Sequence, residues 1–352
     1  MKPSRIFMLS TVSVLIFLTA YIPFCHNVSD RIIEETKFYM GTIVQIKVSI
    51  NPKDDEMKAR KDIDEAFKEI GRVENVFSTF KPYSEISKIN RLKPNEGLMI
   101  SDEAFWLIKK SIDYNKKTQG VFDITVKPLI DLWERAKRTK IIPKDEEIKE
   151  ALTKVGSDYI SLNSSDKTIS FTRSGMGIDL GGVAKGYAAD RAIKILRENG
   201  IKNAIVASGG DMYCLGRKSR RQTWKVGIQH PRNRNEILLK LALEDKSINT
   251  SGDYERFFVL NNRRYSHIID PRTGYPIGDN VVSATVIAED SATSDILATA
   301  LCILGHKGLS IIKTMKGVDA ILIINSNNTL IMEMSEGSKE RYGISEKTAI
   351  EQ

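Results

Sequence analysis

Strand-like and helix-like segments follow one another along this chain without the regular strand–helix alternation that builds a parallel sheet. Residues 39–50 (YMGTIVQIKVSI) alternate and are rich in β-branched side chains, which predicts a strand, whereas residues 56–77 place apolar side chains at helical spacing. Later strand-like segments between residues 159 and 290 are separated by tight turns, which favours antiparallel pairing. The order therefore predicts an α+β fold of mixed, mostly antiparallel sheets with packed helices.

The first 25 residues predict export of the chain. Lys2 and Arg5 precede an uncharged, mostly apolar run over residues 6–24, and Cys25 closes it. A positive start before an apolar stretch is typical of an export signal, and this length lies between a cleaved signal and a spanning anchor. Cys25 suggests a bacterial lipoprotein, although Phe24 stands where such signals usually carry a small residue. An uncleaved anchor is therefore an equal alternative, and simple secretion is a weaker one.

These features divide the chain into four parts. Residues 1–25 form the signal or anchor, residues 26–36 a linker, residues 37–340 one large domain, and residues 341–352 a C-terminal tail. We expect a protein anchored at the bacterial inner membrane, with its domain on the periplasmic, extracytoplasmic side.

Composition limits the possible partners. The net charge of +8 fits an anionic ligand or surface, including a membrane face. The basic residues are spread along the chain, with local clusters only at residues 217–221 (RKSRR) and 261–265 (NNRRY), so nucleic-acid binding is not expected. Cys214 and Cys302 lie in apolar runs, which favours two buried free thiols and leaves one disulfide as the alternative.

Residues 177–192 (GIDLGGVAKGYAADRA) predict a glycine-containing turn that leads into a helix. Gly181 and Gly182 allow close approach to the backbone, and the start of a helix near Lys185 attracts anions. The spacing matches neither of the two common phosphate-binding glycine motifs. Taken alone, the segment favours a helix packed tightly on a strand, with Lys185 in solvent.

Three further patterns carry candidate functional groups. Asp295 and Thr299 lie four apart on a predicted helix, where they could bind Mg²⁺ through oxygen or could serve the helix itself. His267 ends a predicted strand and is the best-placed candidate base of the four histidines, with a structural role as the alternative. Asp123 lies among apolar neighbours, so it either binds a ligand hydroxyl or amine or caps the next turn.

Seven segments in order resemble the ApbE-like FAD:protein FMN transferases, from about Lys37 to Met334. They are YMGT, FSTFKPYSEISKIN, GVFDITVKPLIDLW, IDLGGVAKGYAADRA, ASGGD, SHIIDPRTGYPI and ATSDILATAL. The resemblance implies a fold related to the T-fold, with FAD as substrate in a central cleft and Mg²⁺ at its pyrophosphate. It also implies transfer of FMN to a threonine or serine hydroxyl of a target protein, with release of AMP. Implied acceptors are flavoprotein subunits of membrane redox complexes.

The resemblance also implies individual roles. Asp295, Thr299 and the backbone carbonyl of Ala184 would hold the metal ion. His267 would be the catalytic base that takes the proton from the acceptor hydroxyl. Phe80 stands where relatives often carry a tyrosine against the flavin ring, so stacking is kept without a phenol hydroxyl. The other implied FAD contacts are Met40, Val121, Phe122, Asp123, Gly181, Lys185, Tyr187 and Ile269.

Two other functions use the same residues. A metal-dependent FAD pyrophosphatase would replace the acceptor hydroxyl by water and release FMN and AMP. A flavin-binding lipoprotein without catalysis would need neither the Asp295–Thr299 pair nor His267. The sequence therefore favours an enzyme over a carrier, and it leaves the two enzymatic reactions unseparated.

Overall fold

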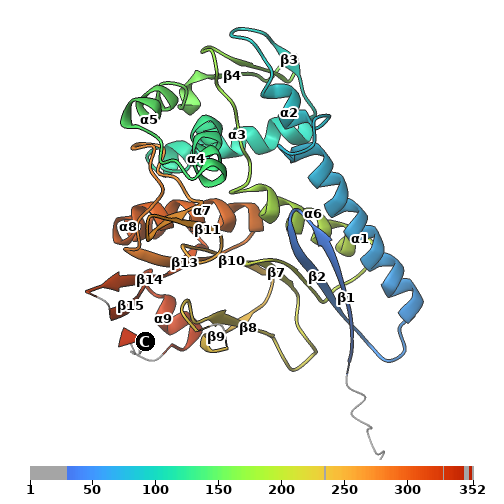
Figure 1. Ribbon diagram of the computed structural model, residues 1–352. Coiled ribbons are helices and arrows are strands. Elements are labelled where there is room, and N and C mark those ends of the chain that lie inside the picture. The colour runs from blue at the N-terminus through green and yellow to red at the C-terminus, as the bar shows by residue number, and fades with distance from the viewer. Residues whose placement is uncertain (1–29, 234, 328, 345–348, 351–352) are drawn as a thin grey trace, which may run out of the picture.

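Nine strands form one sheet that runs through the middle of the molecule (Figure 1). The computed structural model describes residues 30–344 except 234 and 328, and also residues 349–350. All neighbouring strands of this sheet pair antiparallel, so the predicted α+β class with mostly antiparallel pairing is confirmed. The spatial order is β1 (Arg31–Tyr39), β2 (Thr42–Ile50), β6 (Ala204–Ser208), β7 (Asp211–Leu215), β10 (Lys246–Gly252), β13 (Val281–Ala288), β14 (Asp319–Ser326), β15 (Thr329–Met334) and β16 (Ala349–Ile350).

The two faces of the sheet are covered differently. One face packs against long helices, and the β8–β9 hairpin covers part of the other, where Trp224 and Leu241 meet Ile205 and Ile248 of the sheet. The helices on the first face are α1 (Glu56–Phe77), α6 (Ala184–Glu198) and α7 (Ser291–Leu304), with α8 (His306–Lys313) following α7. The hairpin consists of β8 (Trp224–Gln229) and β9 (Ile237–Leu243).

A second group of short elements lies beyond the helical layer (Figure 1). It contains α2 (Glu85–Ile89), α3 (Asp102–Lys117), α4 (Lys127–Thr139), α5 (Asp145–Leu152), β3 (Leu98–Met99), β4 (Ile160–Asn163), β5 (Thr168–Phe171) and the 3₁₀ turns η1 (Ile124–Val126) and η2 (Ser157–Tyr159). The remaining elements are the hairpin of β11 (Phe257–Leu260) and β12 (Arg263–Ser266), and the short helix α9 (Ser338–Tyr342).

Helix α1 shows how the sequence pattern produces its element. The Asp55 carboxylate accepts hydrogen bonds from the backbone of Met57 and Lys58 and caps the helix. The apolar positions at helical spacing, including Ile63 and Phe67, are fully buried against the sheet and α6. The helix spans the predicted residues 56–77 because the capping residue and the row of apolar side chains indicate the same helix.

The sheet extends beyond the predicted domain limits at both ends. β1 begins at Arg31, inside the predicted linker, and β16 pairs with β15 from within the predicted tail. Cys214 and Cys302 are buried free thiols, as favoured from the sequence, and burial raises the pKa of each to about 12. Among residues 30–344 and 349–350, no helix is long and apolar enough to cross a membrane. The apolar run at residues 6–24 and Cys25 lie outside the described residues.

Candidate active site

Helices α6 and α7 touch at a point where only glycine fits. A Cβ at Gly186 would lie 2.2 Å from the backbone oxygen of Ser291, the first residue of α7. The backbone amide of Gly186 donates to Asp295 Oδ2 at 3.1 Å, and the carboxylate of Asp190, one turn along α6, accepts from the amides of Ser291 and Ala292. This contact brings the start of α6 against the first turns of α7.

Three buried charges lie at this contact. Lys185 Nζ is hydrogen-bonded to Asp211 at the start of β7 and lies 3.5 Å from Asp295 Oδ1, while both aspartate side chains are only 2% exposed. Burial disfavours the ammonium, but the two carboxylates outweigh this effect and raise the pKa of Lys185. Burial and the neighbouring charge of Asp295 raise the pKa of Asp211 to about 7. With all three groups ionised the cluster carries one net negative charge, so it favours one more cation.

Thr299 lies one turn after Asp295 and beside the glycine turn. Its Oγ1 is 3.4 Å from Ser251 Oγ and 3.4 Å from where a Cβ on Gly182 would lie. Asp290 caps α7 by accepting from Thr293, whereas the Asp295 carboxylate accepts from the Gly186 amide of α6. Asp295 therefore contacts the start of α6 through Gly186, and Thr299 lies beside Gly182 in the turn that precedes this helix.

The donor types at this position suit Mg²⁺. A carboxylate, a hydroxyl and a backbone carbonyl are hard oxygen ligands, which Mg²⁺ prefers, and it usually completes its shell with water and phosphate oxygens. No three His, Cys, Asp or Glu side chains of the described chain converge on a metal site. A metal held here would therefore depend on Thr299 and the Ala184 carbonyl in addition to Asp295, and the net negative charge supports this fit.

His267 follows β12 and carries a neutral imidazole. Its Nδ1 lies 2.9 Å from the backbone oxygen of Arg256, to which its own amide also donates. A carbonyl only accepts hydrogen bonds, so Nδ1 carries the proton and Nε2 keeps its lone pair. Partial loss of hydration, together with the positive charges of Arg256 and Lys185, lowers the pKa of His267 to about 4, although the residue as a whole is exposed to solvent. The imidazole can therefore accept a proton at neutral pH.

The turn between β1 and β2 reaches the same region. Met40 and Gly41 both have positive φ, at 52° and 70°, which is typical of a two-residue hairpin turn. The Met40 amide donates to Glu74 of α1, and Arg256 Nη2 lies 3.4 Å from the Gly41 oxygen. Arg256 thus connects the Met40 turn with His267, two predicted site residues far apart in sequence.

Phe80 and Gly181 are joined through a carboxylate. The half-buried Asp179 accepts from the Gly181 amide at 2.7 Å and from Thr79 Oγ1 at 3.4 Å, and loss of hydration raises its pKa. Phe80, next to Thr79, is 95% exposed. An aromatic ring with both faces free can stack on a flat ligand ring, and here it stands next to the glycine turn.

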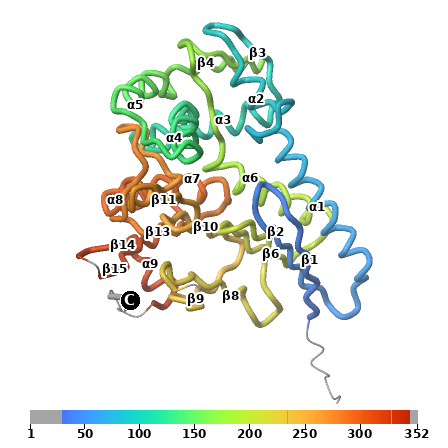
Figure 2. The backbone as a smooth tube through the Cα atoms, in the orientation of Figure 1, coloured from blue at the N-terminus to red at the C-terminus, as the bar shows by residue number. Residues whose placement is uncertain are grey.

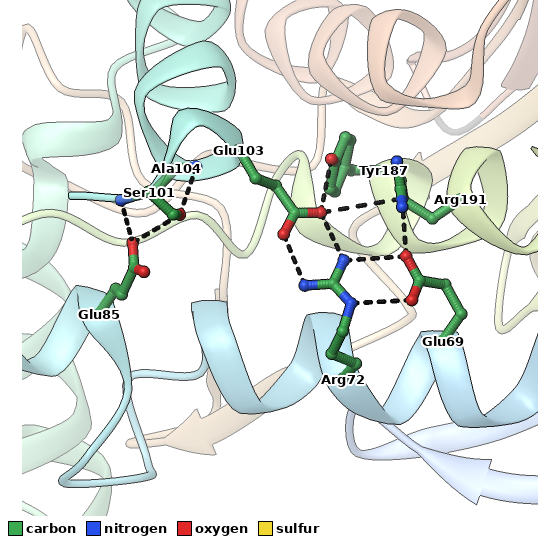
Figure 3. A network of polar contacts seen from close by, with 8 residues as sticks. All are labelled: Glu69, Arg72, Glu85, Ser101, Glu103, Ala104, Tyr187 and Arg191. Atoms are coloured by element: carbon green, nitrogen blue, oxygen red, sulfur yellow. Dashed lines mark hydrogen bonds and ion pairs between the residues drawn. The ribbon is translucent and has the colours of Figure 1, made fainter. Parts of the chain in front are cut away.

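Tyr187 faces a network on the other side of α6 (Figure 3). Its hydroxyl donates to Glu103 of α3 at 2.6 Å, and Glu103 also accepts from Arg72 of α1. Arg72 and Arg191 both bind Glu69, and they lower its pKa to about 2. The network ties α1, α3 and α6 together, so the Tyr187 hydroxyl is already engaged within the protein.

The remaining predicted residues lie in or beside the core. Val121 and Phe122 are buried, and Phe122 Cε2 is 3.1 Å from where a Cβ on Gly182 would lie. The Asp123 carboxylate caps η1, because it accepts from the Thr125 amide and hydroxyl and from Ser157. Of the two roles considered for Asp123 from the sequence, the structure therefore shows the capping of the next turn. Ile269 is buried in a separate apolar cluster with residues of α4 and α5.

Sequence reasoning missed three residues of the site. Asp211 closes the quoted segment ASGGD but was given no role, and Asp179 lies within IDLGG. No sequence pattern could have indicated Arg256, because its backbone oxygen contacts His267 and its side chain contacts the Gly41 oxygen, and neither contact depends on a motif. A carboxylate directly after a glycine pair on a strand was the available signal for Asp211.

Comparisons with known proteins identify the family and the fold of the chain. A family model described as "ApbE family" matches residues 40–322. Among curated proteins, the "FAD:protein FMN transferase" of Buchnera aphidicola subsp. Schizaphis graminum is 32% identical over 297 residues, covering 82% of this chain and 85% of the relative. The solved ApbE protein of Thermotoga maritima superposes with a TM-score of 0.80 at 33% identity, covering 88% of this chain and 99% of the other. "Flavin Transferase ApbE" from Vibrio cholerae gives a TM-score of 0.78 at 29% identity, with 89% and 99% covered.

Proposed function

The chain belongs to the ApbE family, and we propose that it is an FAD:protein FMN transferase that attaches FMN from FAD to a threonine or serine hydroxyl and releases AMP. The names of its curated relatives and of the flavin transferase of Vibrio cholerae support this reaction. One observation carries the proposal for this chain. A buried cluster of two carboxylates and one ammonium, formed by Asp211, Lys185 and Asp295, lies near a neutral histidine whose Nε2 is free to accept a proton.

Three groups would hold Mg²⁺ in this proposal, namely Asp295, Thr299 and the Ala184 carbonyl. When bound, the ion would supply positive charge to the FAD pyrophosphate, on which negative charge develops during phosphoryl transfer. Lys185 stays an ammonium at neutral pH because Asp211 and Asp295 favour its charged form. It therefore adds a fixed positive charge beside the same position.

His267 would act on the acceptor. Its Nε2 takes the proton from the acceptor hydroxyl as the oxygen attacks the phosphorus of the FMN half. The new O–P bond forms while the bond between the two phosphates breaks, and AMP leaves with that electron pair. The hydrogen bond from Nδ1 to the Arg256 oxygen holds the ring in the tautomer that this step needs.

The cleft would be lined by the residues around this centre. Phe80 would stack on the flavin ring, and the Gly181–Gly182 turn would let the nucleotide approach the backbone. Met40, Val121, Phe122, Asp123, Tyr187 and Ile269 remain proposed nucleotide contacts by family resemblance. Tyr187 would contribute through its ring, because its hydroxyl binds Glu103.

Location and partners follow from the N-terminal sequence. Residues 1–25 would anchor the chain at the bacterial inner membrane, through a lipidated Cys25 or through the apolar run itself. The domain would then lie on the periplasmic side. Its acceptors would be flavoprotein subunits of membrane redox complexes, which share that membrane.

Mass spectrometry of the acceptor separates this proposal from its rivals. The full chain is incubated with FAD, Mg²⁺ and a candidate acceptor subunit, and both the acceptor mass and the free nucleotides are measured. An added FMN with equimolar AMP supports transfer. Free FMN and AMP with an unmodified acceptor indicate a pyrophosphatase, and intact FAD indicates a binding protein. The Asp295→Ala variant is the control, since full activity in it contradicts the metal assignment.

A further inference from the structure

A dense basic segment lies far from the flavin site. Residues 217–225 (RKSRRQTWK) carry five lysines and arginines and no acidic residue. They connect β7 with β8, and Lys218, Arg220 and Arg221 are exposed. Within the described chain, no carboxylate lies within ion-pair distance of these three side chains, whereas Arg217 pairs with Glu244. The segment therefore presents uncompensated positive charge to solvent.

This basic loop lies at the end of the sheet where the described chain begins (Figures 1 and 2). The backbone oxygen of Lys218 accepts from Ser49 Oγ at 2.7 Å, and Ser49 pairs with Ile32 in the second position of β1. Lys202 precedes β6 at the same end and is also exposed. In the sequence, the apolar run ends at residue 24, six residues before Asp30. Asp30 directly precedes β1, the strand that begins beside the basic loop.

Acidic residues at this end are largely engaged within the protein. Glu56 pairs with Arg31, and Asp55 caps α1 with its carboxylate. Asp54 accepts from the amide and side chain of Asn51. These contacts leave the cations of the basic loop as the part of this end that is open to an external anion.

We propose that the basic loop, residues 217–225, rests on an anionic phospholipid surface and fixes the orientation of the domain on its membrane. The inference depends on anchoring by the apolar run at residues 6–24, which places the first strand close to the bilayer. Basic clusters next to a membrane anchor bind anionic headgroups, and the attraction acts within about a Debye length of the surface. The loop meets both conditions, in charge and in position.

This orientation sets the height of the flavin site. β1 has nine residues and runs from the membrane end to the Met40 turn, which contacts Arg256 next to His267. At about 3.3 Å per residue, the strand spans roughly 30 Å. The acceptor hydroxyl would therefore have to be presented about 30 Å above the bilayer, which suits an acceptor domain held on its own membrane anchor.

Limited trypsin digestion of the full chain in lipid nanodiscs tests the orientation, because the loop contains its own cleavage sites. The chain is reconstituted in discs of phosphatidylcholine alone and in discs with about one third phosphatidylglycerol. We expect cleavage after Lys218, Arg220 and Arg221 to be at least tenfold slower in the anionic discs. Cleavage after the exposed Lys307 and Lys316, on and after α8, should not change. Equal cleavage of the loop in both discs overturns the proposal.

Charge reversal gives the matched variants. In Arg220→Glu/Arg221→Glu, cleavage after Lys218 should become equal in the two discs, whereas Lys307→Glu/Lys316→Glu should keep the protection of the loop. Protection that survives the loop reversal contradicts an electrostatic contact. A chain that does not float with the discs shows that anchoring itself fails, and it overturns the orientation with it. FMN transfer to a soluble acceptor peptide reports separately on the proposed function.

Discussion

Replacing Gly186 by alanine tests whether the contact between α6 and α7 builds the site. An added Cβ would lie 2.2 Å from the Ser291 oxygen, 2.6 Å from the Ser291 carbonyl carbon and 2.9 Å from the Ala292 nitrogen. All three are backbone atoms, so no side-chain rotation can relieve the clash. Since ordinary contacts lie near 3.5 Å, the two helices must separate by about 1 Å.

The magnitude follows from the contacts that this separation disturbs. Overpacking of a tight interface costs about 1–3 kcal/mol. Lengthening the 3.1 Å bond from the Gly186 amide to Asp295 loses a charge-assisted hydrogen bond worth about 1.5–3 kcal/mol. The better helix propensity of alanine offsets roughly 0.5–1 kcal/mol. We therefore expect a net loss of about 1.5–5.5 kcal/mol of unfolding free energy.

Thermal unfolding of the full chain measures this loss. Gly186→Ala should lower Tm by about 5–10 °C and weaken Mg²⁺ binding in calorimetry, because Asp295 moves with α7. Gly278→Ala is the matched control, since its Cβ would meet no atom within 4 Å. A Gly186→Ala protein with the Tm and Mg²⁺ affinity of the wild type would refute the packing argument.

Three further variants test the charges of the site. His267→Gln should lower kcat by about 10²–10⁴-fold at pH 7–8 with FAD affinity unchanged. A pKa of about 4 keeps the wild-type imidazole neutral throughout this range, so that Nε2 can accept a proton. A variant with the kcat of the wild type would exclude the role of His267 as a base. Asp211→Asn removes the net negative charge of the cluster, so Mg²⁺ should bind at least tenfold more weakly in calorimetry, and unchanged affinity contradicts the charge argument. Lys185→Met leaves two buried carboxylates together without their cation. Denaturant unfolding should therefore show a larger loss of stability at pH 8 than at pH 5, where protonation relieves the repulsion between the carboxylates. A loss of stability that does not depend on pH would contradict this expectation.

Elements with agreeing local signals could be predicted from the sequence. α1 has both a capping carboxylate and an apolar stripe, and its predicted limits match the structure. The antiparallel pairing followed from closely spaced strand patterns. The predicted linker, residues 26–36, took in most of β1, in which Glu34, Glu35 and Lys37 interrupt the apolar pattern, as expected for an edge strand that is protected against further pairing.

The candidate site could be predicted only in part, because its contacts cross the sequence. Helical spacing drew attention to Asp295 and Thr299, but their metal role was implied only by the family resemblance, and Lys185 was expected in solvent from its own segment. In the structure Lys185 binds Asp211, 26 positions away, and its neighbour Asp295, 110 positions away. No periodicity within one element reports a charge that is satisfied by two other elements.

The same residues at the start of α6 therefore serve folding and chemistry together. The close approach at Gly186 buries the Asp295 carboxylate, and a second carboxylate, Asp211, lies within reach of the same amine. Two buried carboxylates without a cation would repel each other and would favour a protonated form. The charge of Lys185 opposes this effect at Asp211, yet burial still raises the pKa of that carboxyl to about 7, and one positive charge can balance only one carboxylate. The fold thus holds two carboxylates against one ammonium, and this excess of carboxylates supports the proposal of a bound metal ion.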